Sequence, residues 1–444
     1  MSNGRKIAYS FGSFGSSLLA NAFSTYIVFY YVDVLKVPTL LITNGMVAYG
    51  IWNAINDPLF GYLSDRTHSR WGRRIPYVAF GMVPLALMFA LVWTPFAKVD
   101  PANYFPIMAY FLVAIFFWDG LYTMVFLNYT ALFPEMYTGL AERSRVSAWR
   151  QVFGILGMIL GIALAPLVYG AVGWAGMGVI FALTATVSVL VSLWGSKENP
   201  AFGEKQSLNI VSALKYTLAN RSFLTYVLSS LAVQFTFVML MAAIPFYAKY
   251  VLHIAKDQQS VMLLGTFTVT LAMLFFWNRV TVRIGARQTM IAAIIIFGVT
   301  LVAFWFASDF ITGAIAAALM GLGLAGLMLL LDVLISDVID EDETRTGVRR
   351  EGMYFGVNAL FIRLGISLQA FAMGRILTAY GYDPKLEVQP ASAEIGLRVV
   401  MTAVPIISLV IALAFIWAYP LHGRRLKEVK TSLAKLRPGD GVAD

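Results

Sequence analysis

Five ionisable side chains stand inside long apolar stretches of this sequence: Asp57, Asp119, Arg150, Asp332 and Arg363. An ionisable group is costly to place in hydrocarbon, so each one in an apolar span is a candidate functional residue. A carboxylate there can bind a small cation or carry a proton, and a guanidinium can hold an anionic group through two parallel hydrogen bonds. The five residues therefore indicate the binding of ions or of an anionic molecule.

Asp57 has polar neighbours at helical spacing. Asn53, Asn56 and Asp57 occupy positions i, i+3 and i+4, which share one face of a helix. A carboxylate flanked by amide oxygens offers hard ligands to a small cation. Because this group holds a single carboxylate, protonation of Asp57 is an alternative, and a plain contact with a neighbouring helix is a third.

The two arginines permit two interpretations. Arg150 and Arg363 can bind an anionic group of a solute, or they can form structural ion pairs with Asp119 and Asp332, respectively. Removing one partner of a buried ion pair damages folding rather than binding. Both interpretations hold together if the solute breaks the pairs when it binds.

The elements that must position these residues are membrane helices. Of the 444 residues, 59% are hydrophobic and 13% are charged, and the mean hydropathy is +0.73, whereas a soluble domain carries about 25% charged residues. A helix needs about 20 apolar residues to span a bilayer. The sequence predicts twelve such spans, near residues 7–32, 40–64, 75–97, 103–132, 145–171, 174–195, 222–247, 259–277, 286–307, 311–336, 352–380 and 396–420.

The predicted fold is an all-α membrane protein with two six-helix bundles. The bundles are expected over residues 1–195 and 222–420, with a polar middle loop at 196–221 and a charged tail at 421–444. Lys and Arg gather in the loops on one side, so both termini and the middle loop are expected in the cytoplasm and the multi-pass chain in the plasma (inner) membrane. The net charge of +9 follows from this bias and does not indicate nucleic acid.

Several functional classes lack their characteristic residues. Cysteine is absent and only three histidines are present, which excludes disulfides and thiolate catalysis and disfavours a histidine metal centre. No phosphate-binding loop with its lysine occurs, so ATP-driven transport by this chain is not expected. We therefore expect neither an enzyme nor a bound cofactor.

Charged clusters recur at matching places in the two halves. The loop after the second span holds Gly61, Asp65, Arg66, Arg70, Arg73 and Arg74. The loop between the tenth and eleventh spans holds Asp337, Asp340, Arg350 and Glu351. Clusters at corresponding places predict an internal repeat.

The loop from Gly61 to Arg74 resembles the signature loop of the major facilitator superfamily. The resemblance implies an interlock, in which the arginines pair with Asp65 or with neighbouring helix ends in one conformation and release in the other. A narrower resemblance, from residue 6 to about 380, is to the glycoside-pentoside-hexuronide:cation symporters, the family of melibiose permease. It rests on Lys6-Ile-Ala-Tyr-Ser-Phe-Gly-Ser-Phe-Gly15, Tyr30-Tyr31-Val-Asp33-Val, Ile51-Trp-Asn-Ala-Ile-Asn-Asp57-Pro58, Ser69-Arg70-Trp71-Gly72-Arg73, Asp337-Val-Ile-Asp340 and Arg350-Glu351-Gly.

This resemblance implies a coupling site on the second helix. In that family the second helix carries the carboxylates for the coupling cation, which implies coupling by Asp57 with Asn53 and Asn56. Thr123 on the fourth helix matches the hydroxyl ligand of the family. Asn53 stands where melibiose permease has a second Asp, so either Na⁺ or H⁺ can be the coupling ion.

The sugar-binding positions differ more strongly. The positions that hold the sugar in melibiose permease match Ser17, Phe126 and Thr130, so both sugar-binding carboxylates are absent. Arg150 and Arg363 match cationic positions of the family. Arginines without the accompanying acids favour a solute with an anionic group, such as a uronide, a sulfosugar or a lysophospholipid.

The expected function is cation- or proton-coupled symport of a glycoside-like, anionic small molecule by alternating access, carried out by a monomer in the lipid bilayer. Trp149, beside Arg150, and Tyr122, beside Thr123, are the aromatic residues expected to contact the solute. A transporter of lysophospholipids or other amphiphiles is the alternative. An intramembrane enzyme or sensor is less favoured, because no catalytic constellation occurs in the sequence.

Overall fold

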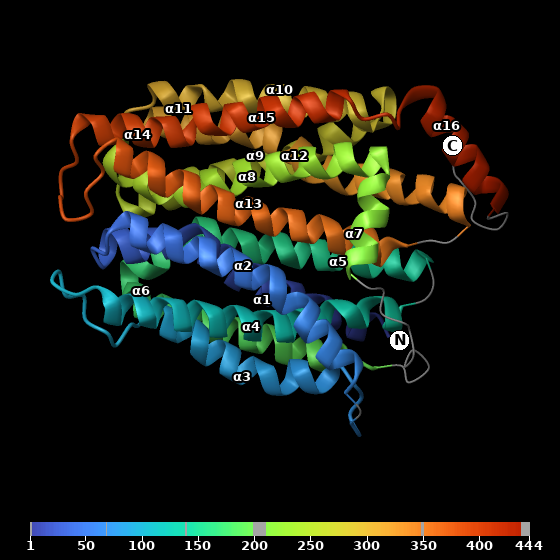
Figure 1. Ribbon diagram of the computed structural model, residues 1–444, viewed down its shortest axis with the longest axis horizontal. Helices are drawn as coiled ribbons and strands as arrows, with labels where there is room; N and C mark the ends of the chain where they lie inside the picture. Colours follow the sequence, from blue (N-terminus) through green and yellow to red (C-terminus); the bar gives the residue numbers. More distant parts are fainter. Residues whose placement is uncertain (1, 68, 138–139, 199–209, 348–349, 437–444) are drawn as a thin grey trace. The chain divides into compact units, whose positions relative to one another are not determined.

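The protein is built from helices. The computed structural model describes residues 2–67, 69–137, 140–198, 210–347 and 350–436. These residues form helices and one isolated β-bridge, and no strand occurs among them (Figure 1). The predicted all-α class is confirmed.

The helices form one set before residue 196 and another after it. The first set is α1 (Asn3–Phe29), η1 (Tyr30–Val34), α2 (Thr39–Asp65), α3 (Ile75–Val92), α4 (Phe105–Met136), α5 (Leu140–Met158), η2 (Ile159–Leu164) and α6 (Ala165–Gly195). The second set is α7 (Ile210–Ala219), α8 (Arg221–Tyr250), α9 (Lys256–Ile284), α10 (Ala286–Leu301), α11 (Ala303–Phe306), α12 (Phe310–Thr346), α13 (Glu351–Ala379), α14 (Ala391–Met401), α15 (Ala403–Trp417) and α16 (Gly423–Leu436).

Nine helical segments among the described residues are long and apolar enough to cross a membrane. One of them, Arg145–Gly195, has 51 residues and is about 77 Å long at 1.5 Å per residue, more than twice the roughly 30 Å of a bilayer core. It contains Gly173, whose φ of +75° is non-helical and is readily adopted only by glycine. The membrane-spanning class is confirmed, and the number of twelve spans stays a prediction.

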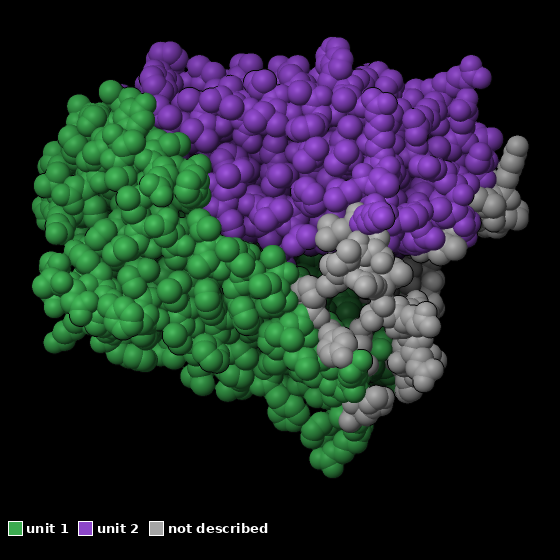
Figure 2. All heavy atoms as spheres, viewed as in Figure 1, with its two compact units in different colours: residues 1–207, 241–264, 370–396 green, residues 208–240, 265–369, 397–444 purple. Residues whose placement is uncertain are grey.

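The chain forms two compact units that do not follow its linear order. Unit 1 contains Met1–Ser207, Met241–Leu264 and Ala370–Gly396, and unit 2 contains Leu208–Leu240, Gly265–Gln369 and Leu397–Asp444 (Figure 2). The ends of α8 and α13 and the beginning of α9 therefore belong to the same unit as α1–α6. The boundaries predicted at residues 195 and 222 stay a prediction.

Within unit 1, α1 packs against α5 and α6, while α4 packs against α2 and α3. Glycine permits the close approach of α1 to the segment after α5, because a Cβ atom at Gly161 would lie 2.7 Å from the carbonyl oxygen of Leu18. The buried hydroxyl of Tyr26 donates to the carbonyl of Ile162 over 2.6 Å in the same contact. Within unit 1, α1 is thus packed mainly against α5, the η2 segment and α6.

Within unit 2, α10 packs against α12 and α15, and the tail helix α16 packs against α12. Hydroxyl groups link further helix pairs. Ser408 of α15 donates to the carbonyl of Ala232 on α8 over 2.8 Å, and Thr266 of α9 donates to the carbonyl of Ala317 on α12 over 2.9 Å. Buried hydroxyls of this kind add directional contacts between apolar helices.

Candidate functional site

A buried polar network joins α2 and α4 in unit 1. Its centre is the carboxylate of Asp119 on α4, which is 1% exposed. Asp119 Oδ1 accepts hydrogen bonds from the Tyr49 hydroxyl over 3.0 Å and from Asn53 Nδ2 over 2.6 Å. Asp119 Oδ2 accepts a short hydrogen bond from Asn56 Nδ2. Three neutral donors from α2 therefore surround one acid from α4.

The network continues from Asn56 to Asp57. The hydroxyl of Thr123 on α4 lies 3.1 Å from Asn56 Oδ1 and 3.1 Å from Asp57 Oδ1. Thr123 has one hydroxyl proton, so it donates to one of these oxygens at a time. Asn56 thus connects two carboxylates, donating to Asp119 through its nitrogen and accepting from Thr123 through its oxygen. Such an arrangement can exchange a proton or offer several hard oxygens to a small cation.

The structure brings together all four residues of the predicted coupling group: Asn53, Asn56, Asp57 and Thr123. Asp119 joins the same network, so the alternative in which it pairs with Arg150 is wrong. The physical reason is that the side of α4 carrying Asp119 faces α2, where Tyr49 and the two asparagines supply its hydrogen bonds. Sequence reasoning missed Tyr49, although it precedes Asn53 by four residues on the same helix face.

Arg150 of α5 lies among hydroxyl and aromatic groups. Its Nε donates to Ser13 Oγ on α1 over 3.3 Å. Its guanidinium carbon lies 4.8 Å from the ring centre of Phe133 and 5.4 Å from that of Tyr129. Arg150 forms no ion pair with any residue that the structure describes. A guanidinium held by a neutral hydroxyl and two ring faces keeps donors for an anionic group.

The residues predicted near the solute have different surroundings. Phe126 is buried against Tyr122 at 4.8 Å between ring centres, and the Tyr122 hydroxyl lies 2.8 Å from Ser16 Oγ. Ser17 Oγ accepts a hydrogen bond of 3.1 Å from the side chain of Asn21. Thr130 is exposed. Trp149 is also largely exposed and packs against Phe153 with 6.1 Å between ring centres.

The other two candidates lie in unit 2. Asp332 of α12 is exposed, and Arg363 of α13 is half-buried. No ion pair between them occurs in the described part of unit 2, so the predicted structural pair is wrong. Arg150 and Arg363 belong to different units.

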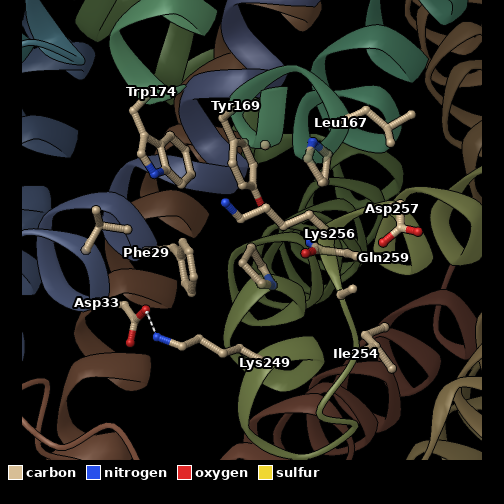
Figure 3. Close-up of a pocket in the computed structure, with 15 residues that line it drawn as sticks. Phe29, Asp33, Leu167, Tyr169, Trp174, Lys249, Ile254, Lys256, Asp257 and Gln259 are labelled. Atoms are coloured by element: carbon tan, nitrogen blue, oxygen red, sulfur yellow. Dashed lines mark hydrogen bonds and ion pairs between the residues drawn. The ribbon is translucent and has the colours of Figure 1, made fainter. Parts of the chain in front are cut away.

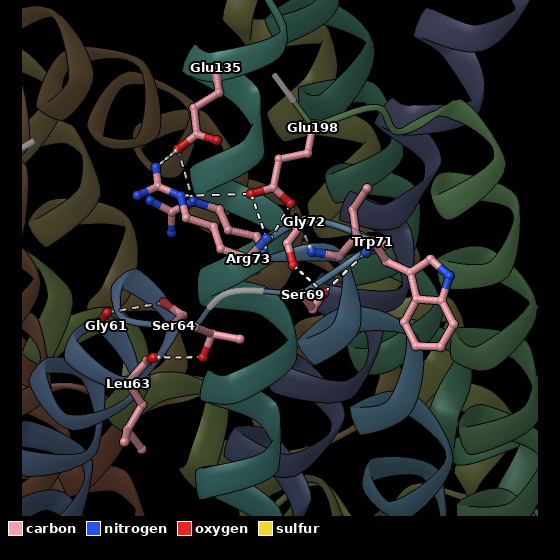
Figure 4. A network of polar contacts seen from close by, with 12 residues as sticks. Gly61, Leu63, Ser64, Ser69, Trp71, Gly72, Arg73, Glu135 and Glu198 are labelled. Carbon is pink, nitrogen blue, oxygen red and sulfur yellow. Dashed lines mark hydrogen bonds and ion pairs between the residues drawn. The ribbon is translucent and has the colours of Figure 1, made fainter. Parts of the chain in front are cut away.

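The loop between α2 and α3 is held by two glutamates (Figure 4). Arg73 Nη2 and Arg74 Nε donate to Glu135 Oε1 at the end of α4 over 2.7 and 2.9 Å. Glu198 accepts the backbone N–H groups of Arg73 and Arg74 over 2.9 and 3.0 Å at the start of α3. An acid at a helix N-terminus is stabilised by the free N–H groups and the helix dipole. The loop is therefore fastened to α4 and to the segment after α6.

The remaining residues predicted in this loop make fewer contacts. Arg70 is exposed and lies over the ring of Trp71 at 4.4 Å, and Arg66 is exposed after the end of α2. Gly61 lies within α2 and is half-buried. The side chain of Asp65 lies outside the described residues, so its predicted pairing stays a prediction. On the same end of unit 1, Lys6 lies 2.5 Å from Glu142, and this hydrogen bond lowers the pKa of Glu142.

The matching cluster in unit 2 contacts the tail helix. Lys430 Nζ lies 2.7 Å from Asp337 and 2.9 Å from Asp340. Burial lowers the pKa of Lys430, but the charge of Asp337 and the hydrogen bonds with both acids outweigh this and raise it. Arg350 lies over the ring of Tyr216 at 4.4 Å, and Glu351 is the first residue of α13. The acids of α12 therefore bind the basic face of α16.

A second network in unit 1 was not predicted. The carboxylate of Asp33, which is 2% exposed, accepts hydrogen bonds from Lys249 Nζ over 2.6 Å, from the Tyr382 hydroxyl over 2.9 Å and from the Tyr250 hydroxyl. Burial and then the charge of Asp33 raise the pKa of Tyr382, so its hydroxyl keeps the proton that it donates. This network ties the end of α1 to the end of α8 and to the segment after α13.

Comparison with known proteins agrees with these features. The chain is 24% identical to the putative glycoside/cation symporter YagG of Escherichia coli K12 over 99% of its own length and 96% of that protein. It is 25% identical to the isoprimeverose transporter of Lactiplantibacillus pentosus, covering 85% and 80% of the two chains. It is 24% identical to the putative sulfoquinovose importer of Escherichia coli K12, covering 95% and 91%.

Solved structures share the fold. The crystal structure of a D-xylose-proton symporter has a TM-score of 0.68 and 13% identity, over 93% of this chain and 97% of that one. The model of the family described as MFS/sugar transport protein matches residues 8–423, which is most of the chain. The chain therefore belongs to the MFS/sugar transport protein family and is a membrane transporter of the major facilitator fold rather than an enzyme.

Proposed function

We propose that this protein carries a glycoside-like solute with an anionic group across the membrane together with a cation or a proton, by alternating access. The named relatives include a putative glycoside/cation symporter and a putative sulfoquinovose importer, and sulfoquinovose is a sugar that bears a sulfonate. Cation-coupled transport of a glycoside-like solute follows from this kinship. The polar network between α2 and α4 supports the proposal for the coupling ion, and Arg150 supports the proposal that the solute carries an anionic group.

The observation that carries the coupling step is the network between α2 and α4. It holds two carboxylates, Asp57 and Asp119, linked by Asn56 and Thr123. Asn53 replaces the second acid that the resembled family has on the second helix, and Asn53 Nδ2 lies 2.6 Å from Asp119. Asp119 thus returns a second negative charge to the group from the neighbouring helix. A cation carried as cargo would be bound by oxygens of Asp57, Asp119, Asn56 and Thr123.

The residues that contact Arg150 favour a solute with an anionic group. The partners of Arg150 among the described residues are the Ser13 hydroxyl and the rings of Tyr129 and Phe133. Arg150 has no counter-ion among the residues that the structure describes. An intramembrane cation without a counter-ion is costly, and an anionic solute would supply one during transport. Arg363 of α13 is the other arginine proposed to contact the solute. Lysophospholipids remain the weaker alternative, because the named relatives carry sugars or related small molecules.

Polar contacts between helices at both ends of unit 1 fit an alternating-access cycle. The Asp33 network joins segments of the first and second halves of the sequence at one end of α1. The Arg73–Glu135 and Arg74–Glu135 contacts at the other end join only segments of the first half. We place the Asp33 end toward the outside and both termini in the cytoplasm, in the inner membrane, with the monomer as the working unit.

The test is thermal unfolding of the purified protein, followed by tryptophan fluorescence, with a panel of solutes. The panel contains methyl β-D-glucoside, methyl β-D-glucuronide, sulfoquinovose and a lysophospholipid, each with and without Na⁺ at two pH values. A ligand that binds the folded state raises its stability by mass action. We expect stabilisation by the two anionic sugars, reduced in Arg150→Gln and unchanged in Arg145→Gln, which removes an exposed charge from the same helix. Stabilisation by methyl β-D-glucoside or the lysophospholipid alone would contradict the anionic assignment.

A further inference from the structure

A cavity of about 720 Å³ lies in unit 1 at the end of α1 that carries Asp33 (Figure 3). Its walls come from α1 and η1, from the beginning of α6, from the end of α8 and from the beginning of α9. No described residue of α2 or α4 lines it, so it is separate from the coupling network. Its volume is within the range of roughly 300–1,000 Å³ that is usual for small-molecule sites.

A buried amide in the cavity wall has an unused hydrogen-bond donor. Gln259 on α9 is 5% exposed, and its Nε2 has no hydrogen-bond partner in the described part of the structure. Figure 3 shows its amide directed toward the space between Tyr169 and Phe29. Burying such a donor without an acceptor destabilises the folded state, and native proteins usually satisfy buried donors. An acceptor group bound in the cavity would satisfy it.

The charge beside Gln259 is positive. The Lys256 ammonium lies 5.4 Å from the ring centre of Tyr169, and Lys256 forms no ion pair with a described residue. The other lysine of the wall, Lys249, is neutralised by Asp33 over 2.6 Å. Asp257 also lines the cavity, and Figure 3 shows Gln259 between it and Tyr169. The middle of the cavity therefore offers one ammonium and one amide N–H group to an anion.

The opposite wall is aromatic. Tyr169 and Trp174 are stacked with 4.0 Å between ring centres and 10° between planes, and Phe29 lies 6.1 Å from Trp174. Ring faces of this kind suit the apolar face of a sugar ring, while its hydroxyl groups need the polar side. The cavity thus combines a cation, an amide donor and a flat apolar wall.

We propose that this cavity is a second binding site for the solute, selective for glycosides that carry a carboxylate or a sulfonate. The inference rests on the proposed function for the identity of the solute. Lys256 attracts the anionic group, Gln259 Nε2 donates a hydrogen bond to one of its oxygens, and the ring packs against Tyr169 and Trp174. The site binds the anionic solute at the end of α1 that carries Asp33, and its positive charge raises the local concentration of that solute.

The first experiment measures transport in proteoliposomes, with methyl β-D-glucuronide and methyl β-D-glucoside as matched probes. Lys256→Gln is expected to raise the KM for the glucuronide about two- to fivefold without changing kcat, because an exposed charge contact is worth about 0.2–1 kcal/mol. The KM for the glucoside should not change. Lys98→Gln, which removes an exposed lysine from the loop before α4, should leave both values unchanged. An equal effect on the two probes, or none, would overturn the proposal.

The second experiment measures binding without transport. In the Arg150→Gln background, saturation-transfer NMR should still show glucuronide binding, and addition of Lys256→Gln or Gln259→Met should weaken that binding by about two- to fivefold. Gln259→Met removes the amide while nearly keeping its volume, so it should also stabilise the empty protein. If the glucuronide binds in a way that depends on Lys256 but the unsubstituted protein does not transport it, the proposed function is refuted and this site is supported. Transport of the glucuronide without binding that depends on Lys256 supports the function and refutes this site.

Discussion

Replacement of Asp119 by asparagine tests the α2–α4 network most sharply. The carboxylate accepts from Tyr49, Asn53 and Asn56, and hydrogen bonds to a charged group contribute about 1.5–3 kcal/mol each, against about 0.5–1.5 kcal/mol for neutral ones. The amide oxygen can keep the bonds of Tyr49 and Asn53 in weakened form, but its nitrogen would face the donor of Asn56. If the Asn56 side chain turns over, it accepts from the new amide and donates to Thr123, which limits the loss.

The expected loss in the free energy of unfolding is therefore about 2–3 kcal/mol, since neighbouring bonds are not additive. The effect on the coupling ion should be larger in relative terms. Loss of one charged contact of about 1.5–3 kcal/mol corresponds to about 10- to 100-fold weaker binding of that ion. Both quantities come from one titration, in which thermal unfolding is followed by tryptophan fluorescence at rising Na⁺ and at several pH values.

The control for this prediction is Asp332→Asn, which removes an exposed acid from α12 in the other unit. That variant should keep the stability and the ion response of the parent protein. If Asp119→Asn also keeps them, the network is neither structural nor coupling, and the reasoning from its geometry fails. If only the pH response changes while Na⁺ has no effect on either protein, the coupling ion is a proton.

Three further predictions concern polar contacts at the ends of helices. Lys430→Gln should detach α16 from α12 and make α16 more sensitive to a protease, with a loss of about 1 kcal/mol in the contact. The folded-state pKa of Lys430 is raised above the usual value of a lysine. The contact should therefore persist at neutral pH and weaken only as the pH rises through that folded-state pKa. Glu198→Gln should lower the free energy of unfolding by about 1 kcal/mol, measured by thermal unfolding, because it removes a charge from the N-terminus of α3. Asp33→Asn should weaken the contact with Lys249 and increase labelling of a single cysteine introduced near the end of α1, which is practical because the natural chain has no cysteine.

Each of these predictions has a result that would contradict it. Protease sensitivity of Lys427→Gln equal to that of Lys430→Gln would show that the effect is general, because Lys427 is exposed on the same helix. An unchanged unfolding temperature in Glu198→Gln would mean that the backbone contacts at α3 do not depend on the charge. Unchanged labelling in Asp33→Asn would show that the Asp33 network does not close this end of the protein.

Local patterns made part of this site predictable. The spacing of Asn53, Asn56 and Asp57 placed them on one helix face, and the structure keeps them together with Thr123. The partners of Asp119 were harder to predict. Charge complementarity suggested an arginine, whereas three neutral side chains donate hydrogen bonds to its carboxylate. The same argument failed for Asp332, because the apolar pattern of α12 does not say which side of the helix is packed.

Contacts between segments far apart in the sequence could not be predicted from local sequence patterns. Asp33 meets Lys249 and Tyr382, which are 216 and 349 positions away in the sequence. Gln259 reads as an ordinary polar residue at the beginning of an apolar span, and its unused donor becomes visible only when its burial is known. The interruption of the segment Arg145–Gly195 at Gly173 was visible as a gap between two predicted spans, because glycine commonly marks such breaks.

The central claim is that a cation or proton gradient drives solute uptake through Asp57 and Asp119. The direct measurement is uptake of methyl β-D-glucuronide and sulfoquinovose into proteoliposomes under an inward Na⁺ or H⁺ gradient. We predict accumulation above the external concentration, which collapses with an ionophore and is lost in Asp57→Asn and Asp119→Asn while these variants remain folded. Equal accumulation in both variants, or uptake that only equilibrates and ignores every cation gradient, would contradict it.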